Sequence, residues 1–223
     1  MKWSVAREDW MNYRALTVSR EFGSGGGRIA NTIAGWLGWK LLDGEIIAAI
    51  ARRAHVDSHV VSTYDERVHS WLRRINEEAV RGVAMASGQP LQENDIFDAH
   101  VMTELTRKII EEAYNSGDCV IVGRGAQCIL ENKKDVFHVF VYAPLRERVK
   151  RLKSRLPVGI DIAQRLRTVD EERAKYLHQR FDKNWCSPHL YDLMISSSQD
   201  EDATARVVLQ AMTGSTVLSE VKV

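Results

Sequence analysis

The chain has 223 residues, of which 44% are hydrophobic and 27% charged, and its formal net charge is +1. This share of apolar side chains can fill a sizeable core, which excludes disorder of the bulk, and the near-neutral charge argues against a dedicated nucleic-acid binder. No apolar run reaches the roughly 18–20 residues of a membrane span, and the polar start does not have the pattern of a secretion signal. We therefore expect a soluble, cytoplasmic globular protein without a nucleic-acid or membrane partner.

Short apolar runs and helical spacings alternate in the first part of the chain. Residues 15–19 form an apolar, β-branched run that predicts a strand, and residues 29–37 have the apolar spacing of a helix that Gly38 ends. A second strand is expected over 39–42 and a second helix from 45 to 54. The order strand, helix, strand is the start of a layered α/β fold.

A helical segment is expected to interrupt this alternation between residues 56 and 115. Within it, residues 68–83 and 97–109 carry apolar side chains every three or four positions. Two continuous apolar runs then follow, at 119–122 and 136–142. Such runs are typical of strands that a parallel sheet buries on both faces.

The remaining elements complete a single domain. A last strand is expected over 190–195 and a last helix over 202–212. The sequence thus predicts an α/β domain over residues 15–212, preceded by an extension of residues 1–14 and followed by a frayed tail of residues 213–223. Cys119, which opens a strand run, is expected to be a buried thiol. The three cysteines have no zinc-ligand spacing, and no metal ligand is expected from the protein.

The sharpest local pattern is Ser19-Arg-Glu-Phe-Gly-Ser-Gly-Gly-Gly-Arg-Ile29, where the first strand meets the first helix. Four glycines in five positions let the backbone turn sharply and direct successive N–H groups to one point, beside the positive end of a helix. This arrangement predicts a phosphate-binding loop. The residues expected to hold a phosphorylated cofactor here are Gly23, Ser24, Gly25, Gly26, Gly27, Arg28 and Ile29.

The loop departs from the P-loop pattern G-x-x-x-x-G-K-[ST], in which a lysine follows the last glycine and a hydroxyl residue comes next. Arg28 and Ile29 follow Gly27 instead. The positive charge is therefore expected from Arg28, or from Arg20 across the loop, and Ser24 is the one hydroxyl group that the loop offers.

These blocks, taken in order, resemble the cytidylate kinase-like family. The similar segments are Ser19–Gly26, Leu41–Ile47, Val120–Arg124, Tyr142–Leu145, Val169–Tyr176, Asn184–Trp185 and Leu190–Leu193. The resemblance spans roughly residues 15–212 and implies a P-loop NTPase-like parallel sheet flanked by helices, with a helical acceptor-binding insert and a basic lid. It also implies ATP and Mg²⁺ as cofactors, and transfer of the γ-phosphoryl group to a nucleoside monophosphate, with CMP or dCMP as the first acceptor to consider.

Three positions depart from the family pattern. Gly27 stands where the loop arginine is usual, Gly44 replaces an arginine beside the acceptor site, and Gly125-Ala-Gln127 replaces Cys-Ala-Asp. These changes bear on catalytic competence more than on nucleotide binding.

Two residues at the ends of expected strands are candidates for the acceptor site. Asp43 follows the second strand, where a crevice for ligands is expected, although it could equally cap the next helix. Arg124 follows a buried strand and could hold a phosphate through two hydrogen bonds. By family position Asp170 and Arg173 join them, and Arg167 is assigned to the same substrate site.

Residues 146–180 carry eleven basic and five acidic side chains, on a helix–turn–helix that Pro157 and Gly159 interrupt. A mobile, positive lid over residues 150–182 would neutralise transferring phosphates, although such charge runs are also common on solvated helix faces. By family position Arg151 and Arg155 lie near ATP. The expected catalytic residues are Arg28, Asp43, Arg124 and Arg155.

Three other functions stay open. A kinase for a different small metabolite is credible because the family arginine is absent at Gly44. A nucleotide-binding regulatory protein without turnover is favoured by the missing loop lysine and hydroxyl group. Nucleic-acid binding through the basic segment is the weakest, since no aromatic stacking platform accompanies the charges. The oligomeric state is left open.

Overall fold

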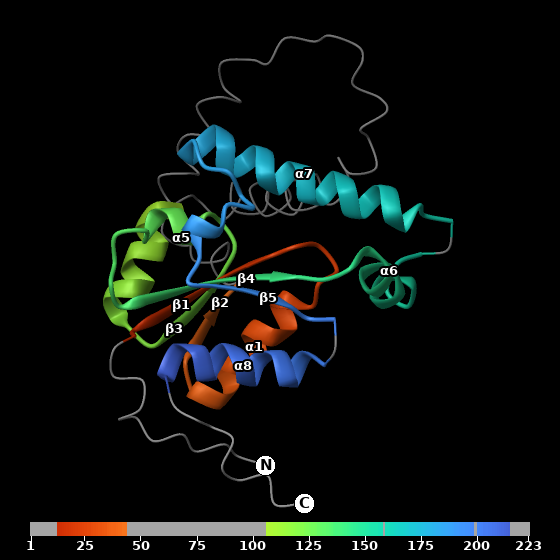
Figure 1. The fold of residues 1–223 in the computed structure, drawn as a ribbon. Coiled ribbons are helices and arrows are strands. Elements are labelled where there is room, and N and C mark those ends of the chain that lie inside the picture. Colours follow the sequence, from red (N-terminus) through yellow and green to blue (C-terminus); the bar gives the residue numbers. More distant parts are fainter. Residues whose placement is uncertain (1–12, 44–105, 158, 199, 215–223) are drawn as a thin grey trace, which may run out of the picture.

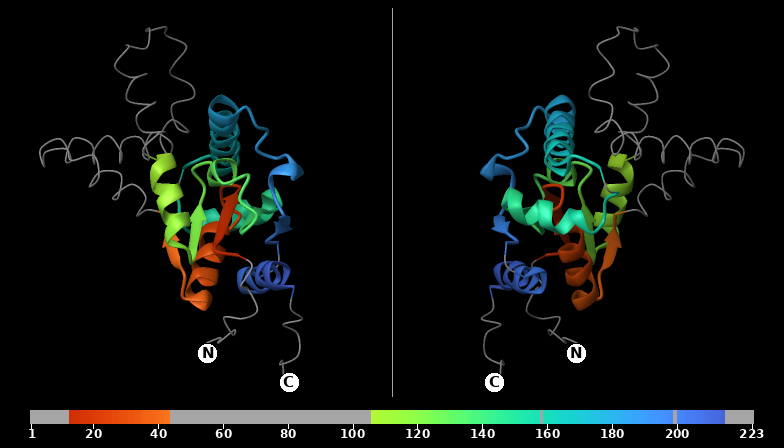
Figure 2. Two further views of the ribbon diagram at one scale, coloured as in Figure 1. Left: turned by 90° about the vertical axis from the view of Figure 1, so that its left-hand side faces the viewer. Right: turned by 90° about the vertical axis from the view of Figure 1, so that its right-hand side faces the viewer.

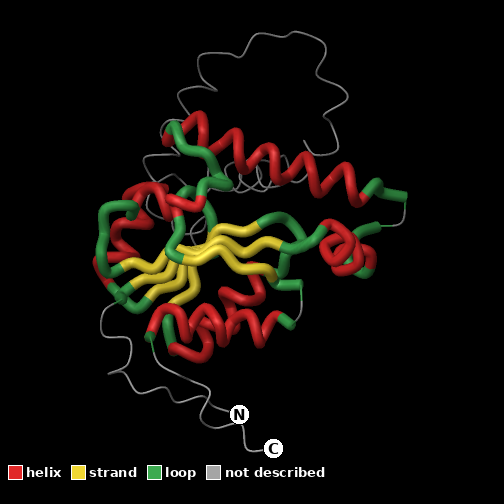
Figure 3. The backbone as a smooth tube through the Cα atoms, in the orientation of Figure 1, coloured by secondary structure: helices red, strands yellow, loops and turns green. Residues whose placement is uncertain are grey.

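The computed structural model describes residues 13–43, 106–157, 159–198 and 200–214. Five parallel strands form one sheet in the order β2-β3-β1-β4-β5. They are β1 (Ala15–Arg20), β2 (Lys40–Leu42), β3 (Cys119–Val122), β4 (Val136–Tyr142) and β5 (Leu193–Ser196). Figure 3 shows these strands as a central layer between two layers of helices.

Helices cover both faces of the sheet (Figures 1 and 2). On one face lie α1 (Gly26–Leu37) and α8 (Glu201–Thr213), and on the other lie α5 (Ala126–Ile129), the helical residues 106–116 and α7 (Ile162–Phe181). The short α6 (Leu145–Lys153) lies beyond the carboxyl end of β4, and a 3₁₀ turn, η2 (Pro188–Leu190), precedes β5.

The alternation of side chains along β1 fills a core on each face. Leu16 and Val18 pack with residues of α1 and α8, whereas Ala15 packs with the helix at 106–116 and with α5. All of β3 and six of the seven residues of β4 are buried, as expected for the centre of a parallel sheet. The predicted α/β fold is therefore confirmed.

Among the described elements, most of the predicted bounds agree with the structure to within one residue. The strands at 119–122 and 136–142 agree residue for residue, and α1 ends at Gly38, whose backbone is left-handed (φ 67°). The last strand is shorter than predicted, because residues 188–190 form the 3₁₀ turn that begins with a proline. Cys119 is buried, as predicted.

Several predictions fall wholly or largely outside the described residues. They are the extension 1–14, the helix 45–54, the insert 56–115 and the tail 213–223; of the insert, residues 106–115 are described and are helical. Among the described helices none is long and apolar enough to cross a membrane.

Candidate phosphate-binding site

The glycine-rich loop lies at the carboxyl edge of the sheet, between β1 and α1. Gly23 (φ 77°) and Gly25 (φ 84°) adopt the left-handed backbone that favours glycine, and Gly25 is the N-cap of α1. Hydrogen bonds from the Arg28 and Ile29 N–H groups to the Gly25 carbonyl close the first helical turn, at 2.9 and 3.1 Å. The first N–H groups of a helix have no helical acceptor, so the start of α1 is suited to an anion.

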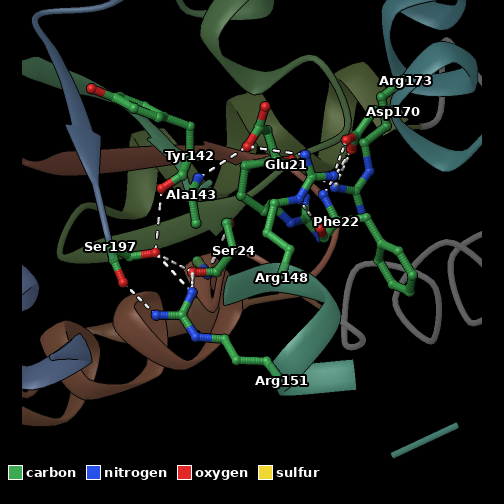
Figure 4. A network of polar contacts seen from close by, with 12 residues as sticks. Glu21, Phe22, Ser24, Tyr142, Ala143, Arg148, Arg151, Asp170, Arg173 and Ser197 are labelled. Atoms are coloured by element: carbon green, nitrogen blue, oxygen red, sulfur yellow. Dashed lines mark hydrogen bonds and ion pairs between the residues drawn. The ribbon is translucent and has the colours of Figure 1, made fainter. Parts of the chain in front are cut away.

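The carbonyl group of Ser24 is held from the side of α6 and β5 (Figure 4). Arg151 Nη1 donates to it at 2.9 Å, and the hydroxyl group of Ser197 donates to it as well. In a trans peptide the C=O and the next N–H point in opposite directions. These contacts therefore fix the N–H group of Gly25 on the opposite side, away from Arg151.

The start of the loop is bound by a second arginine of α6. Arg148 Nε donates to the Phe22 carbonyl oxygen at 2.8 Å, and Arg148 Nη1 lies 3.2 Å from a carboxylate oxygen of Glu21. Its guanidinium group also forms an ion pair with Asp170 of α7, and its side chain is only 8% exposed. Arg148 thus joins the loop, α6 and α7 in one buried polar network (Figure 4).

Asp170, predicted to contact the acceptor, makes its hydrogen bonds to the loop and α6. Besides pairing with Arg148, it accepts a hydrogen bond from the Phe22 N–H group at 2.7 Å. Its predicted neighbour Arg173 donates from Nη1 to the Arg20 carbonyl oxygen at 2.6 Å. The structure therefore places both residues where α7 is tied to the loop.

Three arginines gather beside this loop at the ends of β1 and β3 and on α7: Arg20, Arg124 and Arg173. Burial, together with the charge of Arg20, lowers the pKa of Arg124 to about 10 and that of Arg173 to about 9. Asp43 has the opposite effect on both, and its carboxylate lies 3.7 Å from Arg20 Nη2. Crowded, partly buried positive charges of this kind are stabilised by a bound anion.

The other predicted residues lie elsewhere. Arg28 is the third residue of α1, and its guanidinium group is exposed and paired with Glu201 of α8. Ile29 is fully buried in the core under α1. Arg155 and Arg167 are exposed, the former beyond the end of α6 and the latter on the outer side of α7, bonded to Gln164 at 3.0 Å.

Sequence reasoning missed four residues that shape the loop: Glu21, Arg148, Ser197 and Glu201. Glu21 also accepts a hydrogen bond from the Ala143 N–H group, at 3.0 Å. Glu201 lies where a Cβ atom on Gly25 would be, and it pairs with Arg28. The positions of three of them in the sequence could have pointed to a place near the loop: Ser197 and Glu201 follow the last strand, and Glu21 lies within the loop motif itself.

The carboxylates near the loop bear on how a metal ion could be held. Within the described ranges, no group of three His, Cys, Asp or Glu residues lies close enough together to hold a metal ion. Asp43, which follows β2 at this edge, has a side chain that is 48% exposed.

Comparison with solved structures shows how widely this fold is shared. A protein from Eubacterium ventriosum described as uncharacterized has 21% identity and a TM-score of 0.61, over 91% of this chain and 99% of that one. The shikimate kinase of Acinetobacter baumannii, solved with shikimate, has 14% identity and a TM-score of 0.51, over 94% and 98%. A gluconokinase from Sinorhizobium meliloti has 15% identity and a TM-score of 0.50, over 90% and 92%.

These likenesses show the fold, a parallel sheet between layers of helices, which the chain shares with the shikimate kinase and the gluconokinase. No curated protein matches the chain. The family model that matches, described as the cytidylate kinase-like family, covers residues 15–199. This range includes the glycine loop, the arginines beside it and both helices of the basic segment, so the chain belongs to the cytidylate kinase-like family.

Proposed function

We propose that the protein is an ATP-dependent phosphotransferase that moves the γ-phosphoryl group of ATP to a nucleoside monophosphate, with CMP or dCMP as the first acceptors to test. One observation carries the proposal. The loop that presents the N-terminus of α1 lies beside three arginines, Arg20, Arg124 and Arg173, at the carboxyl edge of the sheet. Phosphoryl transfer depends on positioning and on neutralising the charge of the transition state, and both are available there.

The two substrates would occupy the two sides of this edge. ATP supplies the γ-phosphoryl group, and the residues of the loop from Gly23 to Gly27 are arranged to bind its phosphates, with Arg151 holding the Ser24 peptide. In this proposal Arg124 and Arg173 would bind the acceptor phosphate. Because Arg124 follows β3 and Asp43 follows β2, both side chains start from the edge where an open α/β sheet binds ligands.

Magnesium would reach this site with the nucleotide. Asp43 fits a role in holding a water ligand of Mg²⁺, because its carboxylate is exposed and lies at the strand end. Ser24 fits less well as a metal ligand: it is fully buried, and its hydroxyl oxygen accepts a long hydrogen bond (3.4 Å) from the Gly26 N–H group. The proposal therefore gives the protein no direct metal ligand.

A different small-molecule acceptor is the second candidate. It is favoured by Gly44, which replaces the family arginine beside the acceptor site, and by the shared fold of the shikimate kinase and gluconokinase. A nucleotide-binding regulatory protein is the third candidate. It is favoured by Arg28, which pairs with Glu201 rather than facing the loop.

The test is ATP consumption with Mg²⁺ across a panel of nucleoside monophosphates, shikimate and gluconate, with a control lacking acceptor. The proposal expects turnover above that control with CMP or dCMP. Turnover with shikimate or gluconate alone supports the second candidate. Calorimetric ATP binding with no turnover on any acceptor supports the third.

A further inference from the structure

The structure shows where a P-loop lysine would have to stand. In the P-loop pattern the lysine directly follows the last loop glycine and opens the helix. Here the last left-handed glycine before the helix is Gly25, and α1 begins at Gly26. Gly26, rather than Arg28, therefore occupies the position of the lysine.

No side chain fits at Gly26, because the side chain of Arg20 already fills the space. A Cβ atom on Gly26 would lie 2.5 Å from Arg20 Cβ and 3.1 Å from Arg20 Cγ, with Val141 Cβ at 3.3 Å on the other side. Arg20 is the last residue of β1 and precedes the loop. A lysine at residue 26 and the observed Arg20 side chain thus exclude each other.

A second glycine makes room for the charged end of Arg20. Gly123, which follows β3 and has a left-handed backbone (φ 75°), would place a Cβ atom on the Arg20 guanidinium group. The Arg20 side chain therefore runs in a slot between α1 and the end of β3. Its guanidinium group reaches Asp43, with Nη2 at 3.7 Å from the carboxylate, and the side chain is 22% exposed.

We propose that Arg20 is the cation that binds the polyphosphate of the nucleotide, in place of the P-loop lysine that this chain lacks. The inference rests on the proposed function and adds the residue that contacts the transferred group. A planar guanidinium group can donate two parallel hydrogen bonds to phosphate oxygens, where a lysine gives a point charge.

The surrounding charges fit an anion at this position. Arg124 and Arg173 lie close enough to Arg20 for their charges to repel it, and Asp43 is the carboxylate that faces all three. Asp170 also faces Arg173, at 4.0 Å, but its carboxylate is bound by Arg148 and the Phe22 N–H group. A triphosphate would balance the remaining positive charge.

The test measures binding of ATP and of inorganic tripolyphosphate by calorimetry, in the full chain and in three variants. Arg20→Met is expected to weaken both ligands about ten- to a hundredfold, the usual cost of a lost charge-assisted hydrogen bond. Arg20→Lys, which keeps the positive charge without the two parallel donors, is expected to recover only part of that affinity. Arg146→Met, an 86% exposed arginine on α6, serves as the matched control and should bind as the parent does.

The outcomes separate this inference from the proposed function. If Arg20→Met binds both ligands as the parent does, Arg20 is not the cation, even if the protein transfers phosphoryl groups. If tripolyphosphate binding depends on Arg20 but no acceptor is phosphorylated, the inference stands and the kinase proposal falls. If the parent chain binds neither ligand, both fall. Thermal melting shows whether Arg20→Met is folded, and Arg20→Gln replaces it where it is not.

Discussion

The N–H group of Phe22 donates to the carboxylate of Asp170 at 2.7 Å, which ties the start of the glycine loop to the middle of α7. The same carboxylate pairs with Arg148 of α6. One partly buried side chain, that of Asp170, therefore connects the loop with both helices of the basic segment. A lid role for residues 150–182 stays a prediction. If these helices move as a lid, the contacts of Asp170 either move with the loop or are broken during the movement.

Asp170→Ala should destabilise the protein by about 3 kcal/mol, because it leaves Arg148 buried without its main partner. The side chain of Arg148 is 8% exposed, and Glu21 at 3.2 Å would compensate only in part. Denaturant unfolding measures the change. The neighbouring exposed Glu171 gives the control, since Glu171→Ala should alter stability by less than about 0.5 kcal/mol. Equal effects for the two variants would contradict a structural role for Asp170.

Arg124→Ala should lower kcat/KM for the acceptor, because it removes a charge that binds phosphate. The expected decrease corresponds to a loss of about 2–4 kcal/mol of transition-state stabilisation. Steady-state kinetics at varied acceptor concentration measure this, with KM for ATP followed in parallel. Arg146→Ala on exposed α6 is the control. An unchanged kcat/KM for the acceptor would exclude the assigned role of Arg124.

Glu201→Gln should tighten ATP binding by about 0.5–1 kcal/mol, because it removes a negative charge beside the N-terminus of α1 and frees Arg28. Calorimetry measures the affinity. Asp202→Asn, one residue along and exposed, should have a smaller effect. Weaker binding by Glu201→Gln would instead show that this carboxylate holds Arg151, 3.9 Å away, in its contact with Ser24.

Gly25→Ala should cost about 1–2 kcal/mol of stability through its left-handed backbone alone (φ 84°), and more through contact of the new methyl group with Glu201. Gly35 lies in α1, and a methyl group added there would meet nothing within 4 Å, so Gly35→Ala should stabilise by roughly 0.5–1 kcal/mol. Thermal and denaturant unfolding compare the pair. A Gly25→Ala protein as stable as the parent would contradict the observed backbone.

His138 predicts a dependence of stability on pH. It is buried in β4, its Nδ1 is 2.7 Å from Thr17 Oγ1, and burial lowers its pKa below the usual 6.5. As the pH falls below about 6.5, the unfolded chain binds a proton that the folded chain does not, so stability decreases; above that pH this residue contributes nothing. The difference in unfolding free energy between pH 7.5 and pH 5.5 should therefore be smaller in His138→Gln. An identical difference would refute the assignment.

The strands could be predicted because their signal is local. The runs at Cys119–Val122 and Val136–Tyr142 are apolar nearly throughout, as strands buried on both faces must be, and their predicted bounds agree with the structure residue for residue. Leu190 misled the prediction of the last strand for a physical reason. Its side chain is buried against Trp185 and Phe140, so its apolar character reflects packing of the 3₁₀ turn rather than a place in the sheet.

The loop itself could be predicted, and the family resemblance placed Arg151 near ATP, but the contacts that hold the loop could not be predicted. Gly23 and Gly25 were identified because glycine clusters between a strand and a helix have few structural explanations. The contacts of Arg148 and Arg151 span more than 120 residues to Phe22 and Ser24, and no local pattern distinguishes these arginines from exposed ones in the same helix. The residue that stands in the place of the P-loop lysine could not be predicted either, because three consecutive glycines do not indicate where the helix begins.

The most direct test of the central claim is phosphorus NMR of ATP, Mg²⁺ and a mixture of nucleoside monophosphates with the protein. The account predicts that the γ-phosphate signal of ATP is lost as diphosphate signals of both ADP and the phosphorylated acceptor grow in equal amounts. Release of inorganic phosphate alone, or an unchanged spectrum from a protein that binds ATP, would contradict it.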